Sequence, residues 1–314
     1  MFKKYWEDFG SENNPLCWDQ ADKIYKNLKN TFGPPIWVFR GLNFYKDDNE
    51  NNQLISSFDN ILCHKGIDVT KRWCFEAYIL REFRRKAHLF IKSENIPEPD
   101  DRLEWLSLMR HYLVPCRLVD FTYSFYIALY FALKKSEKEK VCVWAINSKW
   151  LNEENNQKLQ KFRSRNVRKY RKLKDFHQPE TFTRFFFSYN PQKVISGIFP
   201  VNPLRLNERL NQQRGLFLCP ADISKTFEYN LIKGYNPVDL KKNIRRFIIN
   251  SEPTSKKEIL ENLSRMNIDS STLFPDFIGF CESLGDLFYL RIGSDFKDIE
   301  NNLKSTITYK AKMY

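Results

Sequence analysis

Apolar residues recur at helical spacing in several segments that are separated by polar or proline-containing loops. Helices are predicted at residues 19–30, 71–90, 103–111, 124–133 and 255–268, with another after Pro275. Shorter runs rich in aromatic and β-branched residues predict strands at 36–41, 141–146, 182–190, 193–201, 215–220 and 246–250. Ser255 and Glu258 have the spacing of a capping box, which predicts a helix start there.

This order of elements predicts an α+β fold, a small mixed sheet flanked by helices. The predicted sheet contains the strands at 36–41, 141–146, 182–190 and 215–219. Neither an internal repeat nor a Gly/Ser linker divides the chain. We therefore expect one domain over residues 1–314, with a core at about 34–220 and a C-terminal strand and helical portion at about 221–314.

The formal net charge of +13 is the strongest global feature of the 314-residue chain. A surplus of Lys and Arg attracts polyanions, so nucleic acid or a nucleotide is the favoured partner class. A solvated basic surface without a specific partner is the alternative. The chain has no apolar run long enough for a membrane span and no signal-peptide pattern, which predicts a cytoplasmic protein with no membrane partner.

Metal and hydrolase chemistry have little support in the sequence. The seven cysteines form no C-x-x-C pair, and the four histidines lie far apart along the chain. Neither a Ser-His-Asp context nor a spaced carboxylate and histidine ligand set is visible. The sequence therefore predicts no metal site.

Two segments carry candidate chemistry. The first, HYLVPCRLVDFTYSFYIALYFA from His111 to Ala132, places its polar residues directly before an apolar helix, so they either brace a turn or line a site. The second, Lys161 to Lys174, carries eight basic residues and no acidic one. Cations interleaved with aromatic residues are typical of a surface that tracks a phosphate backbone, although a solvated insertion has the same composition. The nucleic-acid-binding candidates in it are Arg163, Arg165, Arg168, Lys169, Tyr170, Arg171 and Lys172.

Four blocks of the chain resemble the FRG-domain family. Phe39-Arg40-Gly41 matches the tripeptide that gives the family its name, and residues 111–132 match its histidine-led block. The third block matches Arg209, Gln213, Gly215 and Phe217, and the fourth matches LFPDFIGF from Leu273 to Phe280. The chain departs from the family pattern at Leu113, where a small residue or glycine is usual, and at Cys116, where threonine is usual.

The resemblance implies an FRG-type domain over residues 1–314 and, by analogy, an ADP-ribosyltransferase-like core. The F-R-G strand and the D-F-T-Y-S loop look like the arginine strand and Ser-Thr-Ser strand of ADP-ribosyltransferases, which consume NAD. Some family members are similar to toxins of phage-defence and toxin–antitoxin loci, so a toxin-like role and an inhibitory antitoxin partner are implied. Together with the +13 charge, this favours nucleic acid, RNA before DNA, as the acceptor.

Residue roles follow from the chemistry that ADP-ribosyl transfer requires, namely phosphate anchors, a ribose orienter and a polar stabiliser. The expected NAD-binding residues are Arg40, Gly41, Arg117, Thr122 and Ser124, and the expected catalytic residues are His111, Asp120, Gln213 and Glu208. Glu76 is a further candidate for the catalytic carboxylate and also a candidate ion-pair partner for Arg40. Ser124 is equally well placed to cap the following helix, and Asp120 to brace a turn. In the alternative reading, the protein is a non-catalytic nucleic-acid-binding module whose 111–124 block is structural.

Overall fold

The computed structural model of the protein describes residues 5–30, 37–43, 54–64, 71–165, 179–187 and 195–291. Within these residues one mixed sheet is formed, with the strand order β1-β7-β4-β2-β3-β6-β5. The pair β1–β7 is parallel, and the other neighbouring pairs are antiparallel. The strands are β1 (Glu7–Phe9), β2 (Trp37–Leu42), β3 (Val119–Thr122), β4 (Lys140–Asn147), β5 (Ile198–Val201), β6 (Gly215–Pro220) and β7 (Ile244–Asn250).

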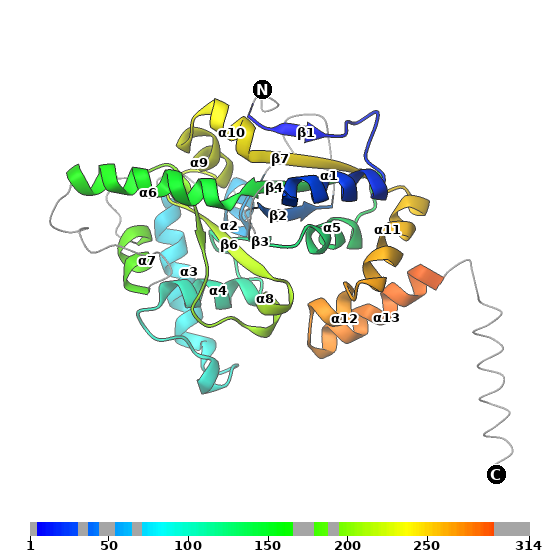
Figure 1. Ribbon diagram of the computed structural model, residues 1–314. Coiled ribbons are helices and arrows are strands. Elements are labelled where there is room, and N and C mark those ends of the chain that lie inside the picture. The colour runs from blue at the N-terminus through cyan, green and yellow to red at the C-terminus, as the bar shows by residue number, and fades with distance from the viewer. Residues whose placement is uncertain are drawn as a thin grey trace, which may run out of the picture.

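Helices cover both faces of this sheet (Figure 1). They are α1 (Trp18–Asn30), α2 (Ser57–His64), α3 (Arg72–Ala87), the 3₁₀ turn η3 (Ser93–Asn95), α4 (Arg102–His111), α5 (Phe125–Lys134), α6 (Ser148–Arg165), α7 (Pro179–Phe186), α8 (Glu208–Gln212), α9 (Phe227–Gly234), α10 (Pro237–Asn243), α11 (Pro253–Arg265), α12 (Ser270–Leu273) and α13 (Phe277–Arg291). The α+β fold class predicted from the sequence is therefore confirmed.

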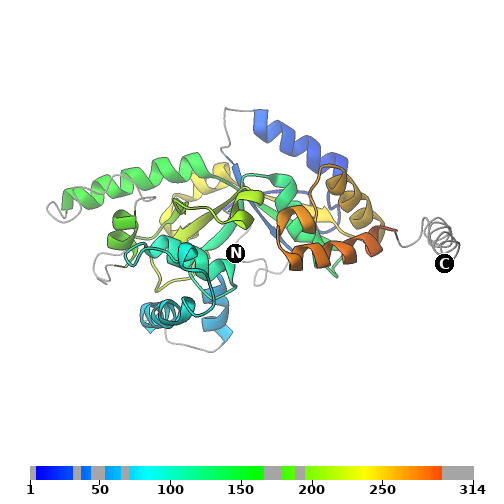
Figure 2. The same cartoon turned by 90° about the horizontal axis from the view of Figure 1, so that it is seen from below.

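The apolar core is divided among the two faces of the sheet. On one face, α6, α9 and α10 pack over a continuous cluster that contains Trp144 and Phe227. On the other face, α1, α5 and α11 cover β2, β4 and β7, whereas α3, α4, α7 and α8 cover β5 and β6. We call the helices α1, α5 and α11 the first group and α3, α4, α7 and α8 the second group; both lie on this face. Figure 2 shows the two groups on either side of the central strands. The boundary between the groups lies over β2 and β3.

The sheet opens between β2 and β3, its two central strands. Strand β2 pairs with β4 along its full length, from Trp37 to Leu42, but with β3 at Phe39↔Thr122 alone. Beyond that pair, Arg40 and Gly41 separate from the residues of β3 that an unbroken antiparallel ladder would place opposite them. This divergence leaves space in the middle of the sheet, next to the boundary between the two helix groups.

Two predictions about local structure were wrong. The segment from residue 182, predicted as a strand, forms the end of α7, and its last residues, 188–190, lie outside the described residues. Phe182, Phe185 and Phe186 stand at i, i+3 and i+4, so the aromatic run forms one helical face that packs near Phe199. Helix α11 begins two residues before Ser255, with Glu252 at its N-cap and no side-chain cap bond.

Gly41 is required by the packing of helix α5 on β2. A Cβ atom at Gly41 would lie 2.0 Å from the carbonyl oxygen of Ala128 and 2.7 Å from the backbone nitrogen of Ala132. Gly41 was expected to bind NAD, and the close contact at this position is with the α5 backbone.

We expect Gly41→Ala to lower the free energy of unfolding by roughly 3 kcal/mol or more, because α5 must move away from the sheet. The measurement is denaturant-induced unfolding followed by circular dichroism. Gly285→Ala on α13 is the matched control, since a Cβ there meets nothing within 4 Å. The control should be neutral or slightly stabilising. Equal stability of the two variants would contradict the packing argument.

Candidate functional site

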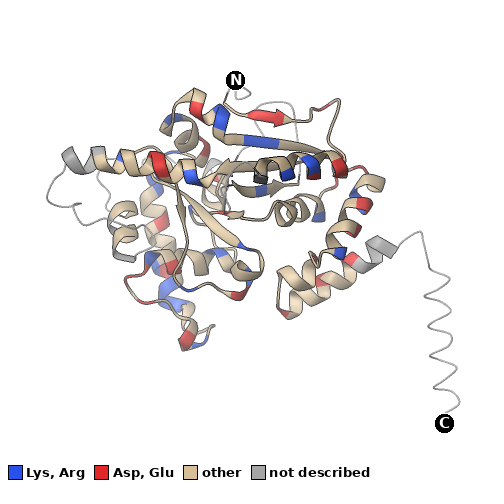
Figure 3. Cartoon of the chain, in the orientation of Figure 1, with Lys and Arg blue, Asp and Glu red and all other residues tan. Residues whose placement is uncertain are grey.

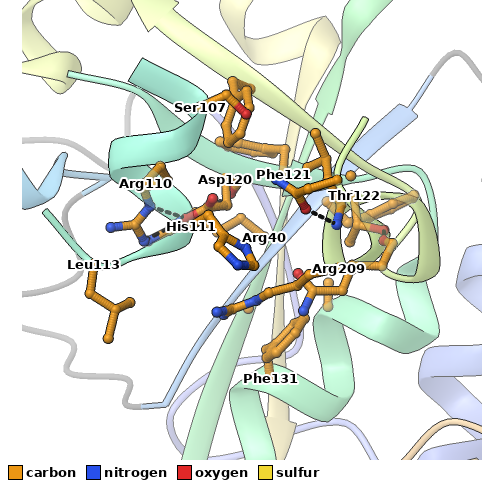
Figure 4. A pocket seen from close by; sticks show the side chains of 18 residues that line it. Arg40, Ser107, Arg110, His111, Leu113, Asp120, Phe121, Thr122, Phe131 and Arg209 are labelled. Atoms are coloured by element: carbon orange, nitrogen blue, oxygen red, sulfur yellow. Dashed lines mark hydrogen bonds and ion pairs between the residues drawn. The ribbon is translucent and has the colours of Figure 1, made fainter. Parts of the chain in front are cut away.

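A cavity of about 230 Å³ occupies the place where β2 and β3 separate. Its walls come from β2, β3, α4, α5, α8 and β6, and therefore from both helix groups (Figure 4). The polar side chains that line it are Arg40, Ser107, Arg110, His111, Asp120, Thr122, Asn207, Arg209 and Gln213. We call this cavity the central pocket. The structure thus brings together residues that are up to 173 positions apart, from Arg40 to Gln213.

Asp120 is held by two arginines at one side of the central pocket. Arg110 donates from Nε to Asp120 Oδ2 at 2.6 Å, and its Nη2 lies 2.5 Å from the same oxygen. Arg40 Nη1 donates to the backbone carbonyl oxygen of Asp120 at 2.8 Å and lies 3.8 Å from its carboxylate. The Arg40 side chain therefore bridges the two strands where their ladder is interrupted, and Arg110 is the main partner of the Asp120 carboxylate.

The charges in the central pocket act on one another strongly. Burial raises the pKa of Asp120, but Arg110 outweighs this effect with help from Arg40 and Arg209, so the pKa lies below its ordinary value. Burial lowers the pKa of Arg40 to about 10, with Asp120 opposing and Arg110 adding to the shift. At neutral pH the carboxylate and the guanidinium are both charged.

Arg209 is the third cation of the central pocket and is held differently. Its Cζ lies 4.5 Å from the centre of the Phe274 ring, and within the described residues it has no hydrogen bond or ion pair. Burial lowers its pKa, while Asp120 and, more distantly, Asp276 and Glu282 oppose the shift. Figure 4 shows its guanidinium extending toward His111 and Arg40. Three arginines therefore face one aspartate in the wall, and this excess of positive charge suits an anionic ligand.

Two buried nitrogen atoms in the wall of the central pocket have no hydrogen-bond partner among the described residues, Nε of Arg40 and Nδ1 of His111. Buried polar atoms are nearly always satisfied in folded proteins, so unsatisfied ones at a cavity indicate a place for a ligand or water. Burial, reinforced by the charge of Arg209 and opposed by Asp276, lowers the pKa of His111. The imidazole is therefore neutral at pH 7.

Of the three candidates for the polar stabiliser, Gln213 lines the central pocket. Its Nε2 donates to the carbonyl oxygen of Leu273 at 3.0 Å, which fixes the amide and leaves Oε1 as an acceptor. Glu208 is exposed in the first turn of α8 and does not contribute to the wall. Glu76 lies elsewhere, buried against Arg117.

Thr122 and Ser124 have local structural partners. The Thr122 hydroxyl donates to the carbonyl oxygen of Gln213 at 2.7 Å and accepts from the Ser124 backbone at 3.0 Å. Ser124 Oγ accepts from the backbone nitrogen of Ile127 at 3.3 Å as the N-cap of α5. The capping alternative for Ser124 is thus confirmed, and Thr122 holds Gln213 beside the pocket.

Arg117 was predicted to bind a cofactor, but its guanidinium is buried in an ion pair. Nε donates to Glu76 Oε1 at 2.8 Å, Nη2 donates to Glu76 Oε2, and Nη1 donates to the carbonyl oxygen of Phe186 at 3.3 Å. Neither Arg117 nor Glu76 lines the central pocket. The Arg117–Glu76 ion pair, with the hydrogen bond to Phe186, connects the residues just before β3 to α3 and α7.

The chain turns sharply after α4, where Leu113 adopts a φ of 59°. This left-handed conformation is unusual for a leucine and explains why a glycine suits the position. Leu113 is exposed and lies in the rim of the central pocket (Figure 4). The departure from the family pattern therefore adds an apolar side chain to the rim.

The predicted nucleic-acid-binding run falls mostly outside the described residues. Arg168, Lys169, Tyr170, Arg171 and Lys172 lie in the segment that the structure does not describe. The backbone of Arg163 and Arg165 belongs to the end of α6, and their side chains lie outside the described part of the structure. Their role stays a prediction.

The described residues contain neither a metal-binding cluster nor a membrane-spanning helix. Within residues 5–30, 37–43, 54–64, 71–165, 179–187 and 195–291, no group of three or more His, Cys, Asp or Glu side chains is arranged to hold a metal ion. Across the same ranges, no helix has the length and apolar character needed to cross a membrane.

The family model of the FRG domain matches residues 36–141. This region contains Arg40, Gly41, Arg110, His111 and Asp120, and it ends before the blocks that contribute Arg209 and Gln213. No curated protein and no solved structure matches the chain.

Proposed function

We propose that the central pocket binds NAD and that the protein transfers ADP-ribose from NAD to nucleic acid, with RNA favoured as the acceptor. One observation carries the proposal: three arginines converge with two unpartnered buried nitrogen atoms on a cavity in the FRG-matching region and its neighbour α8. Arginines recognise phosphate oxygens through paired N–H groups, and the two phosphates of a dinucleotide match this excess of positive charge.

The size of the central pocket limits what it can enclose. Its volume of about 230 Å³ is smaller than the roughly 300–1,000 Å³ typical of sites that bury a whole drug-sized ligand. We therefore expect it to hold the pyrophosphate and the adjoining nicotinamide ribose, with the adenosine end in the open mouth. In this arrangement Arg40 and Arg209 contact phosphate oxygens, and Asp120 fixes Arg110 and Arg40 in position.

The proposed reaction breaks the bond between ribose C1′ and the nicotinamide nitrogen, and the bonding electrons leave with neutral nicotinamide. The acceptor atom of the nucleic acid bonds to C1′ and loses its proton. His111 is neutral with a free Nδ1, so it is our candidate for accepting that proton. Gln213 Oε1 is our candidate for accepting a hydrogen bond from a ribose hydroxyl, because the amide is fixed by its hydrogen bond to the Leu273 carbonyl oxygen.

A non-catalytic nucleic-acid-binding module is the second candidate. It is favoured by the structural roles of Ser124, Thr122 and Arg117, which account for part of the 111–124 block without a ligand. The transferase proposal includes a toxin-like role in phage defence or in a toxin–antitoxin system, with an inhibitory antitoxin as partner. This role is supported by the family resemblance.

The deciding experiment incubates the purified protein with NAD labelled in the adenylate portion, separately with total RNA, DNA and cell protein. Label attached to RNA is the expected result. Label attached to DNA or protein would keep the transferase and change the acceptor. If no label is attached and no ADP-ribose is released, while RNA is still bound, the binding-module reading replaces the proposal.

We expect Arg209→Gln to weaken NAD binding by about 10- to 100-fold with a small decrease in the thermal unfolding midpoint. The side chain makes no hydrogen bond or ion pair among the described residues, and the substitution removes its cation–π contact with Phe274. Calorimetric titration with NAD measures the effect. Arg205→Gln, an exposed arginine four residues earlier that does not line the central pocket, is the matched control. Equal weakening by both variants would show that overall charge, not the pocket, determines binding.

A further inference from the structure

A second and larger cavity lies on the far side of helix α4 from the central pocket. Its volume is about 990 Å³, and it is formed by one face of α3, the segment from Ser93 to Pro99, the start of α4 and the end of α7. We call it the α3 groove. Helix α4 turns Ser107 and Arg110 toward the central pocket and Arg102 and Trp105 toward the α3 groove, so the two cavities share this helix as a wall.

One aromatic side chain and several basic side chains line the α3 side of the groove. Trp73, Ala77, Arg81, Arg84 and His88 follow one another at spacings of three or four residues, so they form one stripe on the helix. The stripe runs over sixteen residues, from Trp73 to His88, and its ends are about 22 Å apart along the helix axis. Arg85 stands beside it, and Figure 3 shows Lys and Arg gathered toward the end of α3.

Most of this positive charge is not neutralised within the described residues. Glu82 is the shared partner of Arg81, Arg85 and Lys86, at 3.6, 3.0 and 3.4 Å. One carboxylate therefore faces three cations, whose side chains are 60–67% exposed. The hydrogen bond from Arg85 contributes most to lowering the pKa of Glu82, which remains ionised. Across the groove, Glu98 is the remaining acidic side chain in the wall apart from Glu76, which is paired with Arg117.

The groove also presents flat surfaces that are held in place. Trp105 is buried, at 4% exposure, and its Nε1 donates to the carbonyl oxygen of Glu98 at 3.0 Å. Arg84 lies 5.3 Å from the centre of this ring, so the surface presented to the groove here is the Arg84 guanidinium plane. Arg102 lies 5.8 Å from the centre of the Phe187 ring. Trp73 is 39% exposed at the start of the stripe. Aromatic rings and arginine planes next to exposed cations are the surfaces on which unpaired bases stack while phosphates are neutralised.

We propose that the α3 groove is a binding site for single-stranded nucleic acid. Its length suits several nucleotides of an extended strand, and its stacking surfaces require bases that are not paired. The residues that line the groove are not those of the basic run predicted at 161–174, and the binding does not depend on NAD chemistry. If the proposed transferase function holds, the groove is where its acceptor strand docks.

The test uses the full chain without NAD and a fluorescein-labelled 20-nucleotide RNA of mixed sequence, with binding followed by anisotropy over a salt series. The Arg81→Gln/Arg85→Gln double variant should bind about tenfold more weakly, with a smaller salt dependence, because two phosphate contacts are lost. Lys241→Gln/Lys242→Gln on α10 is the matched control, since it removes the same charge from exposed positions outside the groove. It should bind like the unaltered protein.

Three outcomes would overturn the inference. Equal weakening by both double variants would show that net charge alone governs binding. No weakening by either would place the RNA elsewhere on the protein. Equal affinity for a duplex of the same RNA, or for labelled polyglutamate of matched charge, would remove the assignment to single-stranded nucleic acid. Thermal unfolding of each variant verifies that the fold is retained, and none of these results depends on whether NAD is consumed.

Discussion

Arg40→Ala is expected to reduce NAD consumption by about 100-fold or more while leaving the affinity for RNA unchanged. The Arg40 guanidinium lines the central pocket and donates from β2 to the backbone carbonyl oxygen of Asp120 on β3. Its Nε has no hydrogen-bond partner among the described residues. Removing a buried charged group from a phosphate contact generally costs about 2–5 kcal/mol of binding free energy. The measurement is nicotinamide release at subsaturating NAD, with RNA anisotropy in parallel.

The controls for Arg40 separate chemistry from folding. Arg40→Lys keeps the charge but loses the fork of N–H groups, so it should recover little activity. Arg245→Ala is the matched variant, because Arg245 is also largely buried on a strand, pairs with Glu7 at 3.0 Å and donates to the carbonyl oxygen of Lys241 at 2.6 Å. It does not line the central pocket. Full activity in Arg40→Ala would contradict the assignment of this pocket to NAD.

Glu76→Gln is expected to lower the free energy of unfolding by about 3–5 kcal/mol, because it leaves Arg117 as a buried charge without a counter-charge. Both side chains are almost inaccessible, at 1% and 3% exposure, and together they join α3 to the segment that leads into β3. Chemical unfolding followed by fluorescence measures the loss. The central pocket should bind its ligand normally in the molecules that remain folded.

Glu82→Gln on the same helix is the matched control for Glu76. Glu82 has three cationic neighbours, but they are exposed to solvent, so its loss should change the free energy of unfolding far less than the loss of Glu76. A double variant, Glu76→Leu with Arg117→Met, should regain most of the stability that Glu76→Gln loses, because an apolar pair removes both buried charges. If Glu76→Gln were as stable as Glu82→Gln, the Arg117 ion pair would not be buried in solution.

The spacing of apolar residues correctly predicted the helices and strands that bury one continuous apolar face. Helix α5 and strands β2, β4 and β6 were found where the apolar pattern placed them. The aromatic run that forms α7 was assigned wrongly, because five closely spaced aromatic residues satisfy the strand and the helix pattern equally well. Its helical state is determined by contact with Phe199, a residue distant in sequence.

The candidate site was predicted in part. Arg40, His111, Asp120 and Gln213 were named from motifs and do meet in one pocket. Arg110 was missed, although it directly precedes His111, because nothing in a sequence tells which of several arginines will bind a given aspartate. Arg117 was expected to bind NAD, but it pairs with Glu76. Ion-pair partners are set by tertiary packing, and Glu76 is 41 residues from Arg117.

Helix α4 forms a wall of both the central pocket and the α3 groove, and this arrangement has a thermodynamic consequence. If occupation of one cavity displaces the helix, the geometry of the other cavity changes as well. Linkage then requires the effect to be reciprocal: the factor by which RNA alters the affinity for NAD equals the factor by which NAD alters the affinity for RNA. Two titrations, each performed with and without the other ligand, would give the same coupling free energy.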